Sequence, residues 1–423
     1  MISPAVSETP AVPAAAPVKN LGWMVTFAGM GINLALGVLY SWSVIKGAIE
    51  KDFGWEAARL NDPYALCCIA FAFSMILAGR CQDKFGPRIT AFLGGLLVGV
   101  GLFIASRSNS YLSWVIGFGL FAGIGIGFGY SSATPPALKW FPPAKTGLVA
   151  GLVVAGFGLA SVYIAPLTKY LIARHGVLAA AFFYSIFFVL VVCGLALLLV
   201  NPPAAYVAAT KPGAPAAARS AADSATPGEM LRTPTFWLLW VIYFIGAGAG
   251  LMVISSLSSM AQKSMGEAAF VAVAVLAVGN ATGRIVAGTL SDRIGRRSTL
   301  TIVLLFQAVL MFLAIPVTSS KEMQAVVIVL VAALIGANYG ANLALFPSFT
   351  KDLWGLKNFG INYGIVFTAW GVGGFVLSRL KQMLKASSGS FTSSFVTAGV
   401  LLVIGAALTR MLKPRPAKAA LPA

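Results

Sequence analysis

Twelve apolar runs of helical length recur along the chain, and they restrict its fold more than any other feature. A helix needs about 20 apolar residues to cross the hydrocarbon core of a bilayer. Hydrophobic residues make up 58% of the sequence and charged residues only 10%, so a soluble fold could not cover the apolar surface. We therefore predict an all-α membrane protein with twelve transmembrane helices and almost no extramembrane domain. The expected helices are 22–44, 63–79, 89–106, 111–131, one that begins after Lys145, 177–200, 236–258, 268–290, 299–317, 323–345, 360–380 and 392–411.

The polar segments divide the chain into two halves. Residues 1–20 and 413–423 are expected to be tails, and the first lacks the apolar core of a signal peptide. Residues 201–234 are rich in Pro, Ala and Ser, which is typical of a flexible linker. This linker would join an N-terminal six-helix bundle, 21–200, to a C-terminal one, 235–412.

A short polar motif is repeated in the two halves. Gly-x-x-x-Asp83-x-x-Gly-x-Arg88 follows the second expected helix of its half, and the same spacing returns 209 residues later with Asp292 and Arg297. Transporters built from two parallel repeats place the substrate site between the halves at mid-membrane. The repeat therefore predicts two pseudo-symmetric bundles with a site at their interface.

The formal net charge of +18 does not indicate a nucleic-acid-binding protein, because the basic residues are scattered over short loops. Cytoplasmic loops of membrane proteins carry an excess of Lys and Arg. The tails, the linker and the loops on their side hold 18 of the 30 basic residues, the opposite side holds 11, and Arg284 is the remaining one. This bias predicts that both termini are cytoplasmic.

No signature of an enzyme is visible in the sequence. The four cysteines lie in or beside apolar runs, and the chain shows no metal-ligand spacing, nucleophile–base pair or phosphate-binding loop. The run GIGIGFG at 123–129 follows no strand, so close helix packing is its expected use. We expect no enzymatic activity, no cofactor and no metal.

Arg284 points most directly to a function, because it lies within the apolar run 268–290. It is roughly 10 Å along the helix from the polar residue Ser291. An intramembrane charge is rare and marks a functional site by default. Its planar guanidinium can bind a carboxylate through two parallel hydrogen bonds, and Asn280 shares its helix face. The alternative is that the side chain of Arg284 only extends to the interface between membrane and water.

Twelve helices, a central linker and paired Gly-x-x-x-Asp motifs resemble the major facilitator superfamily over the whole chain. In that family such motifs form a cytoplasmic latch between the halves. The resemblance implies a gating role for Asp83, Arg88, Asp292 and Arg297.

The position of Arg284, four residues before Gly288, resembles the helix 8 arginine of monocarboxylate transporters and of oxalate/formate antiporters. Tyr40-Ser-Trp42 and Leu345-Phe-Pro-Ser348 resemble segments of the antiporters. We consider the chain most similar to bacterial L-lactate transporters of the monocarboxylate family. That resemblance implies a monomeric, multi-pass protein of the cell (inner) membrane.

The resemblance also implies which residues line the cavity with Arg284 and Asn280, although helix packing is a comparable role for each of them: Tyr40, Tyr130, Phe157, Tyr339 and Trp370. The antiporters carry a lysine on helix 11, and alignment on Asn362-Tyr-Gly364 places Trp370 at that position. A single fixed positive charge suits a monoanion, because a dianion would keep one charge unpaired in a poor solvent.

These observations predict a secondary active transporter that moves small monocarboxylates, such as L-lactate or pyruvate, by alternating access. The family implies a proton as co-substrate. All twelve Asp and Glu residues fall in tails, loops or helix ends, so the proton would travel with the substrate or water near Arg284. Two alternatives remain: a carboxylate exchanger of the oxalate/formate type, and a nontransporting membrane sensor.

Overall fold

The computed structural model describes residues 19–56, 59–203, 206, 224–265, 269–319, 325–388 and 392–412. These residues form helices and no strands, and eleven of their helical stretches are long and apolar enough to span a membrane. The predicted tails and most of the predicted linker lie outside the described residues. The predicted all-α membrane fold is confirmed.

The N-terminal half begins with a crossing made of three consecutive elements, α1 (Gly22–Leu36), η1 (Gly37–Ser41) and α2 (Trp42–Phe53). Two single helices follow, α3 (Asp62–Phe85) and α4 (Pro87–Ser106). The next crossing combines α5 (Tyr111–Trp114), the π-helical η2 (Val115–Ala122) and α6 (Gly123–Trp140). The short η3 (Pro143–Lys145) leads into α7 (Thr146–Ala196).

Helix α7 accounts for two crossings. Its 51 residues would extend about 75 Å as one helix, more than twice the thickness of the hydrocarbon core. Gly176 interrupts it with φ 79° and ψ 169°, a conformation that side-chain-bearing residues rarely adopt. The eleven apolar stretches therefore make twelve crossings, as predicted.

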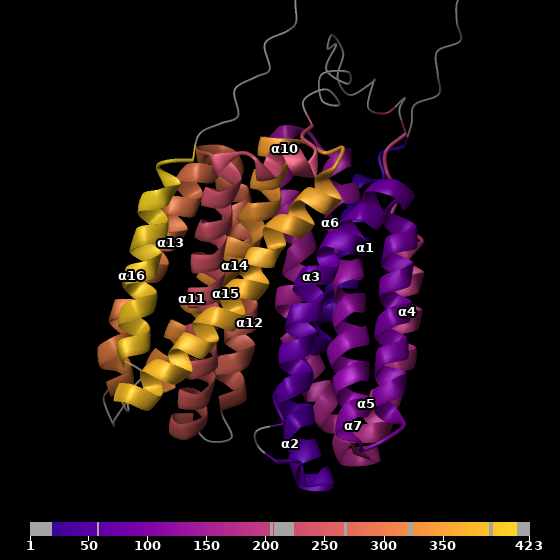
Figure 1. The fold of residues 1–423 in the computed structure, drawn as a ribbon, viewed down its shortest axis with the longest axis vertical. Coiled ribbons are helices and arrows are strands. Elements are labelled where there is room, and N and C mark those ends of the chain that lie inside the picture. Colours follow the sequence, from indigo (N-terminus) through magenta and orange to yellow (C-terminus); the bar gives the residue numbers. More distant parts are fainter. Residues whose placement is uncertain are drawn as a thin grey trace, which may run out of the picture.

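The C-terminal half begins with the short α10 (Pro227–Leu231), whose start is stabilised by a capping box between Thr226 and Glu229. Six long helices follow it: α11 (Pro234–Met265), α12 (Ala269–Ile294), α13 (Arg296–Ser319), α14 (Ala325–Trp354), α15 (Phe359–Ser388) and α16 (Thr392–Thr409). Figure 1 shows these helices as one bundle beside the N-terminal one. The first and last described residues lie at the same end as α10, which we call the α10 end.

Two helix ends differ from the sequence prediction. Residues 46–62 were expected to form a loop, but α2 is helical up to Phe53, and Gly54 ends it with φ 66°. Helix α3 extends beyond 79 to Phe85, so Asp83 lies in its last turn. The second glycine of each repeated motif, not the first, ends the helix, because Gly86 and Gly295 have φ of 86° and 90°.

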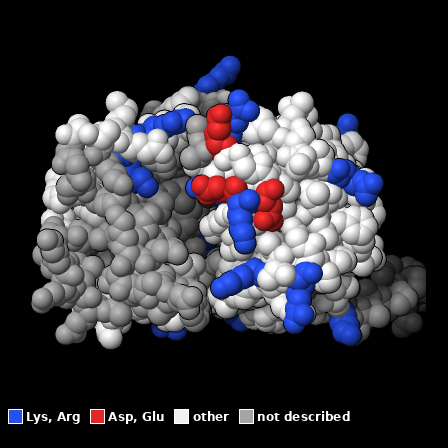
Figure 2. All heavy atoms as spheres, turned by 90° about the horizontal axis from the view of Figure 1, so that it is seen from below, with Lys and Arg blue, Asp and Glu red and all other residues white. Residues whose placement is uncertain are grey.

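The opposite end of the molecule is polar over the described part of the N-terminal bundle. Acidic and basic side chains gather there in Figure 2. Arg59 pairs with Glu56 at 3.8 Å, and the Tyr111 hydroxyl donates to Asp62 at 2.7 Å. Both contacts are solvent-exposed, so this end is suited to an aqueous phase.

Small residues bring the two bundles together near the α10 end. Helix α7 packs on α12, and α3 packs on α15. Gly147 of α7 and Gly288 of α12 lie so close that a Cβ on either would collide with the carbonyl oxygen of the other. The interface therefore needs glycine at both positions.

Candidate functional site

Arg284 lies near the middle of α12, ten residues before its last residue Ile294. Its side chain is fully buried, with 0% of its surface exposed. Nε donates to Asn280 Oδ1 at 2.9 Å, and Nη1 donates across the bundle interface to the Val154 carbonyl of α7 at 2.5 Å. Nη2 has no hydrogen-bond partner among the described residues. The guanidinium is thus hydrogen-bonded through Nε and Nη1, while the buried Nη2 is without a partner among the described residues.

The close approach of α7 to α12 explains why this charge lies at the interface between the bundles. A Cβ on Gly151 would collide with the carbonyl oxygen of Arg284, and a Cβ on Gly158 would lie 3.2 Å from Asn280 Oδ1. Glycine at these positions lets the backbone of α7 reach the guanidinium. An arginine that extended to the membrane–water interface would instead expose its charged group to solvent.

Tyrosines from three crossings lie near Arg284. Tyr130 and Tyr339 are buried and Tyr40 is half-buried, and each lies close enough to Arg284 to interact with it electrostatically. The Tyr339 hydroxyl also accepts a hydrogen bond of 2.8 Å from Trp370 Nε1. A carboxylate at Arg284 would therefore meet several O–H donors.

Aromatic rings enclose the same region. Phe157 makes edge contacts with Tyr40 and Tyr130, at centroid distances of 5.4 and 5.5 Å. Phe71 packs on Tyr130 at 5.4 Å and on Trp370 at 5.3 Å. The structure thus brings together every residue predicted for substrate binding: Arg284, Asn280, Tyr40, Tyr130, Phe157, Tyr339 and Trp370.

Four further aromatic residues belong to this region, and sequence reasoning missed them. Phe71, Phe367, Tyr243 and Tyr363 are buried and join the cluster through ring contacts. In the sequence they look like ordinary residues of apolar helices. Only Tyr363 carried a signal, since it lies in the Asn-Tyr-Gly segment that was used for alignment alone.

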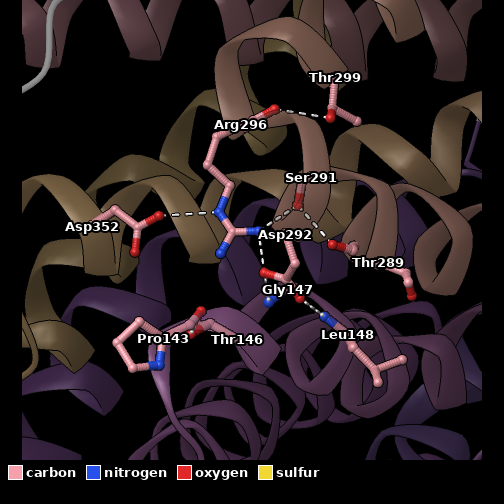
Figure 3. A network of polar contacts seen from close by, with 12 residues as sticks. Pro143, Thr146, Gly147, Leu148, Thr289, Ser291, Asp292, Arg296, Thr299 and Asp352 are labelled. Carbon is pink, nitrogen blue, oxygen red and sulfur yellow. Dashed lines mark hydrogen bonds and ion pairs between the residues drawn. The ribbon is translucent and has the colours of Figure 1, made fainter.

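The second polar centre of the bundle interface lies at the α10 end, around Asp292 (Figure 3). Its two carboxylate oxygens accept hydrogen bonds of 2.9 Å from the backbone N–H groups of Gly147 and Leu148, in the first turn of α7. Arg296 forms an ion pair of 2.6 Å with Asp292 and one of 3.0 Å with Asp352. A carboxylate at a helix N-terminus is favoured by the free N–H groups and the helix dipole.

Asp83 occupies the equivalent position in the other half. Its oxygens accept hydrogen bonds of 2.9 Å from the backbone N–H groups of Gly360 and Ile361, in the first turn of α15. Each of the two aspartates therefore binds the start of a helix in the opposite bundle. Both aspartates thus join the two bundles at the α10 end.

The arginines of this region differ from the predicted arrangement. The resemblance implied a role in the latch for Arg88 and Arg297 beside the two aspartates, but the aspartates bind backbone N–H groups of the opposite bundle. Arg88 and Arg297 are exposed, and within the described parts of the chain neither side chain makes a hydrogen bond or ion pair. Sequence reasoning missed Arg296 and Asp352, and also Lys351, whose Nζ donates to Thr146 Oγ1 across the interface at 2.5 Å.

A comparison with known families decides the classification. Residues 21–378 match the Major Facilitator Superfamily, which is most of the chain. The chain belongs to this superfamily. It is therefore a multi-pass membrane transporter, and the resemblance inferred from the sequence is confirmed.

Relatives within the superfamily include carboxylate carriers. The chain is 30% identical to the oxalate:formate antiporter of Oxalobacter formigenes over 385 residues, covering 90% of this chain and 88% of the relative. It is 26% identical to monocarboxylate transporter 13 of Rattus norvegicus over 393 residues, covering 92% and 88%. An uncharacterized superfamily transporter of Escherichia coli, YhjX, is 26% identical over 354 residues, covering 83% and 85%.

Solved structures of the superfamily share the fold. The proton:xylose symporter XylE superposes with a TM-score of 0.72 at 15% identity, covering 94% of this chain and 97% of that one. FucP in the outward conformation gives 0.69 at 14% identity, covering 93% and 99%. At 14% and 15% identity, this likeness shows only that the chain shares the fold of these transporters.

Proposed function

We propose that this transporter moves small monocarboxylates, such as L-lactate or pyruvate, by alternating access, with Arg284 as the carboxylate anchor. The main support for this proposal is that the guanidinium of Arg284 is fully buried at the interface of the two bundles. Its Nη2 has no hydrogen-bond partner among the described residues. Burying a charge without a full set of partners is costly. A bound carboxylate would complete its hydrogen bonds and neutralise it.

The number of fixed charges supports a monoanion as substrate. Arg284 is the only Lys or Arg that is buried in the part of the chain that the structure describes. At the place where a second cation would be needed, Trp370 donates to Tyr339 and packs on Phe367. A dianion would leave one charge uncompensated in a medium that solvates it poorly.

A carboxylate exchanger is the second candidate, because the oxalate:formate antiporter is 30% identical over most of the chain. An exchanger and a symporter can share one anchor and one gating mechanism. Preloading liposomes with unlabelled carboxylate separates the two functions. An exchanger takes up labelled substrate only against internal counter-substrate, whereas a symporter also takes it up into empty vesicles.

This proposal assigns gating to Asp83 and Asp292. Because Lys and Arg are in excess on the side of α10, it also places that end in the cytoplasm. In this proposal the bundle contacts at the α10 end close the cytoplasmic side of the site. Arg296 takes the place in the latch that the sequence suggested for Arg297, and Arg88 stays free to pair in another state.

Proton coupling belongs to the proposal as well. In the described ranges, each Asp, Glu and His lies in a connection or within about a turn of a helix end. None of them is at the depth of Arg284. The proton would therefore move together with the substrate or through water beside Arg284.

The test of the anchor compares Arg284→Lys and Arg284→Ala with wild type by calorimetric binding of L-lactate. Losing the partner of a buried carboxylate costs about 2–5 kcal/mol, so Arg284→Ala should bind at least about 30-fold more weakly. Lysine keeps the charge but not the planar fork, so it should also bind poorly. Arg410→Lys, an exposed site at the end of α16, is the matched control. Near-equal affinities of wild type and Arg284→Lys would refute the anchor.

A further inference from the structure

Three buried phenols meet near Arg284. Tyr130 comes from α6 of the N-terminal bundle, whereas Tyr243 of α11 and Tyr363 of α15 come from the C-terminal bundle. All three rings pack around Phe367, at centroid distances of 5.4, 6.2 and 5.9 Å. The group therefore spans the interface between the two bundles.

Their hydroxyls form one group beside the arginine. Arg284 and the Tyr363 hydroxyl are both neighbours of the Tyr130 hydroxyl, and Tyr243 neighbours Tyr363 in turn. The hydroxyls of Tyr243 and Tyr363 nevertheless make no hydrogen bond of good geometry with any described residue. Both lie in tyrosines that are at least 98% buried. Buried hydroxyls are normally hydrogen-bonded, so unpaired ones need an explanation.

Packing alone does not explain these two hydroxyls. The ring of Tyr243 stacks on Phe346 at 3.7 Å with an interplanar angle of 12°, and the ring of Tyr363 stacks on Phe359 at 5.7 Å. Phenylalanine would make the same stacking contacts without burying an unpaired O–H. Packing therefore requires the rings but not the hydroxyls, whose polar neighbours include one another and Tyr130.

We propose that Tyr130, Tyr243 and Tyr363 form a second polar subsite that binds the oxygen on carbon 2 of a 2-hydroxy or 2-oxo monocarboxylate. This inference rests on the proposed role of Arg284 as the carboxylate anchor. The oxygen on carbon 2 is adjacent to the carboxylate, just as Tyr130 is adjacent to the guanidinium, and Tyr243 and Tyr363 neighbour Tyr130 in turn. A phenol both donates and accepts hydrogen bonds, so it matches a hydroxyl as well as a keto oxygen.

The substrate's alkyl end has a separate environment in this arrangement. Phe71, Phe157 and Phe367 present ring faces and edges to the same region. They would surround a methyl group while the phenols bind the oxygen. A site built to hydrogen-bond a substrate oxygen discriminates against the analogue that lacks it, because its own polar groups are then left unpaired.

The experiment measures binding of L-lactate, pyruvate and propionate, which share a three-carbon chain and one carboxylate. We compare wild type with Tyr243→Phe, Tyr363→Phe and the double variant. The expected preference of wild type for lactate over propionate is at least about tenfold, the equivalent of one net hydrogen bond. Each single variant should lower this preference several-fold, and the double variant should remove it while propionate affinity stays within about threefold.

Tyr184→Phe is the matched control, because Tyr184 is equally buried but bonds Thr168 within the N-terminal bundle. Its lactate preference should equal that of wild type. A parallel loss of lactate and propionate binding in the double variant would mean that the phenols only pack, and would overturn the proposal. So would an unchanged preference in a double variant that remains monodisperse.

Failure of the anchor gives a different result from failure of the subsite. If wild type binds none of the three acids, the proposed function fails and the subsite fails with it. If wild type binds all three equally and Arg284→Ala binds none, the anchor stands and the subsite alone is refuted.

Discussion

At the scale of single residues, the site depends on how one charge is divided among its partners. Nε of Arg284 donates a hydrogen bond to Asn280 and Nη1 donates one to the Val154 carbonyl, and both acceptors are neutral. Neutral acceptors orient the guanidinium without cancelling its charge. The attraction for an anion is therefore retained, and it is stronger in this buried setting than in water.

The same reasoning predicts the effect of a second charge at position 370. Trp370→Lys should raise the affinity for oxalate relative to L-lactate by about tenfold or more, because a dianion would then find two cations. Trp370→Met, which removes the indole without adding a charge, is the control. Competition of each acid against labelled lactate measures the ratio. If Met and Lys change it equally, charge number does not determine the substrate class.

At the scale of helices, the two bundles are joined through helix starts. The first turns of α7 and α15 offer free N–H groups, and Asp292 and Asp83 bind them from the opposite bundle. The repeated motif predicted that these two aspartates are equivalent. Their acceptor role could not be predicted, because backbone N–H groups carry no signature in the sequence.

The two halves of this latch are predicted to differ in strength. A carboxylate at a helix start contributes about 0.5–2 kcal/mol. Asp292 also pairs with Arg296, four positions later, at 2.6 Å, whereas the residue four positions after Asp83 is Pro87, which carries no charge. Asp292→Asn should therefore shift the equilibrium toward an open α10 end more than Asp83→Asn.

Two measurements check this prediction. Exchange of labelled lactate in liposomes reports the rate of cycling, and calorimetry reports affinity. We expect the cycling rate to change by several-fold in both variants, with lactate affinity changed less, because the aspartates bias conformations without contacting the ligand. Equal loss of equilibrium binding in both variants would count against gating.

At the scale of the whole molecule, the fold was predictable because the bilayer imposes it. Every backbone polar group in hydrocarbon must be paired within its helix, so apolar runs of sufficient length become spanning helices. The run that follows Lys145 illustrates this, since two crossings were expected there and Gly176 divides α7 accordingly. Arg284 and Asn280 could be found as well, because polar residues are conspicuous in apolar runs.

The sequence could not predict which residues from distant parts of the chain contact one another in the site. Phe71, Tyr243 and Phe367 are apolar or aromatic residues among many others of the same kind. Their place in the site follows from contacts between helices that are distant in the sequence: Phe71 meets Phe367 across the two bundles, and Tyr243 meets Phe367 within the C-terminal one. Likewise, Arg296 and not its neighbour Arg297 reaches Asp292, because the glycine turn at Gly295 sets which side of α13 faces α12.

The last prediction concerns orientation in the membrane. Twelve crossings place both ends of the described chain and α10 on one side, and the excess of Lys and Arg predicts that this side is cytoplasmic. Single cysteines replacing Lys51 of α2 and Arg232 next to α10, both exposed, probe the two ends after the four native cysteines are replaced by serine. A membrane-impermeant maleimide should label position 51 in intact cells, and position 232 only after permeabilisation. The fold has an even number of crossings between the termini and an odd number between positions 51 and 232, which places these two positions on opposite sides. Labelling of both from outside would contradict this topology. The reverse pattern would keep the fold but invert the orientation, and the closed α10 end would then face outward.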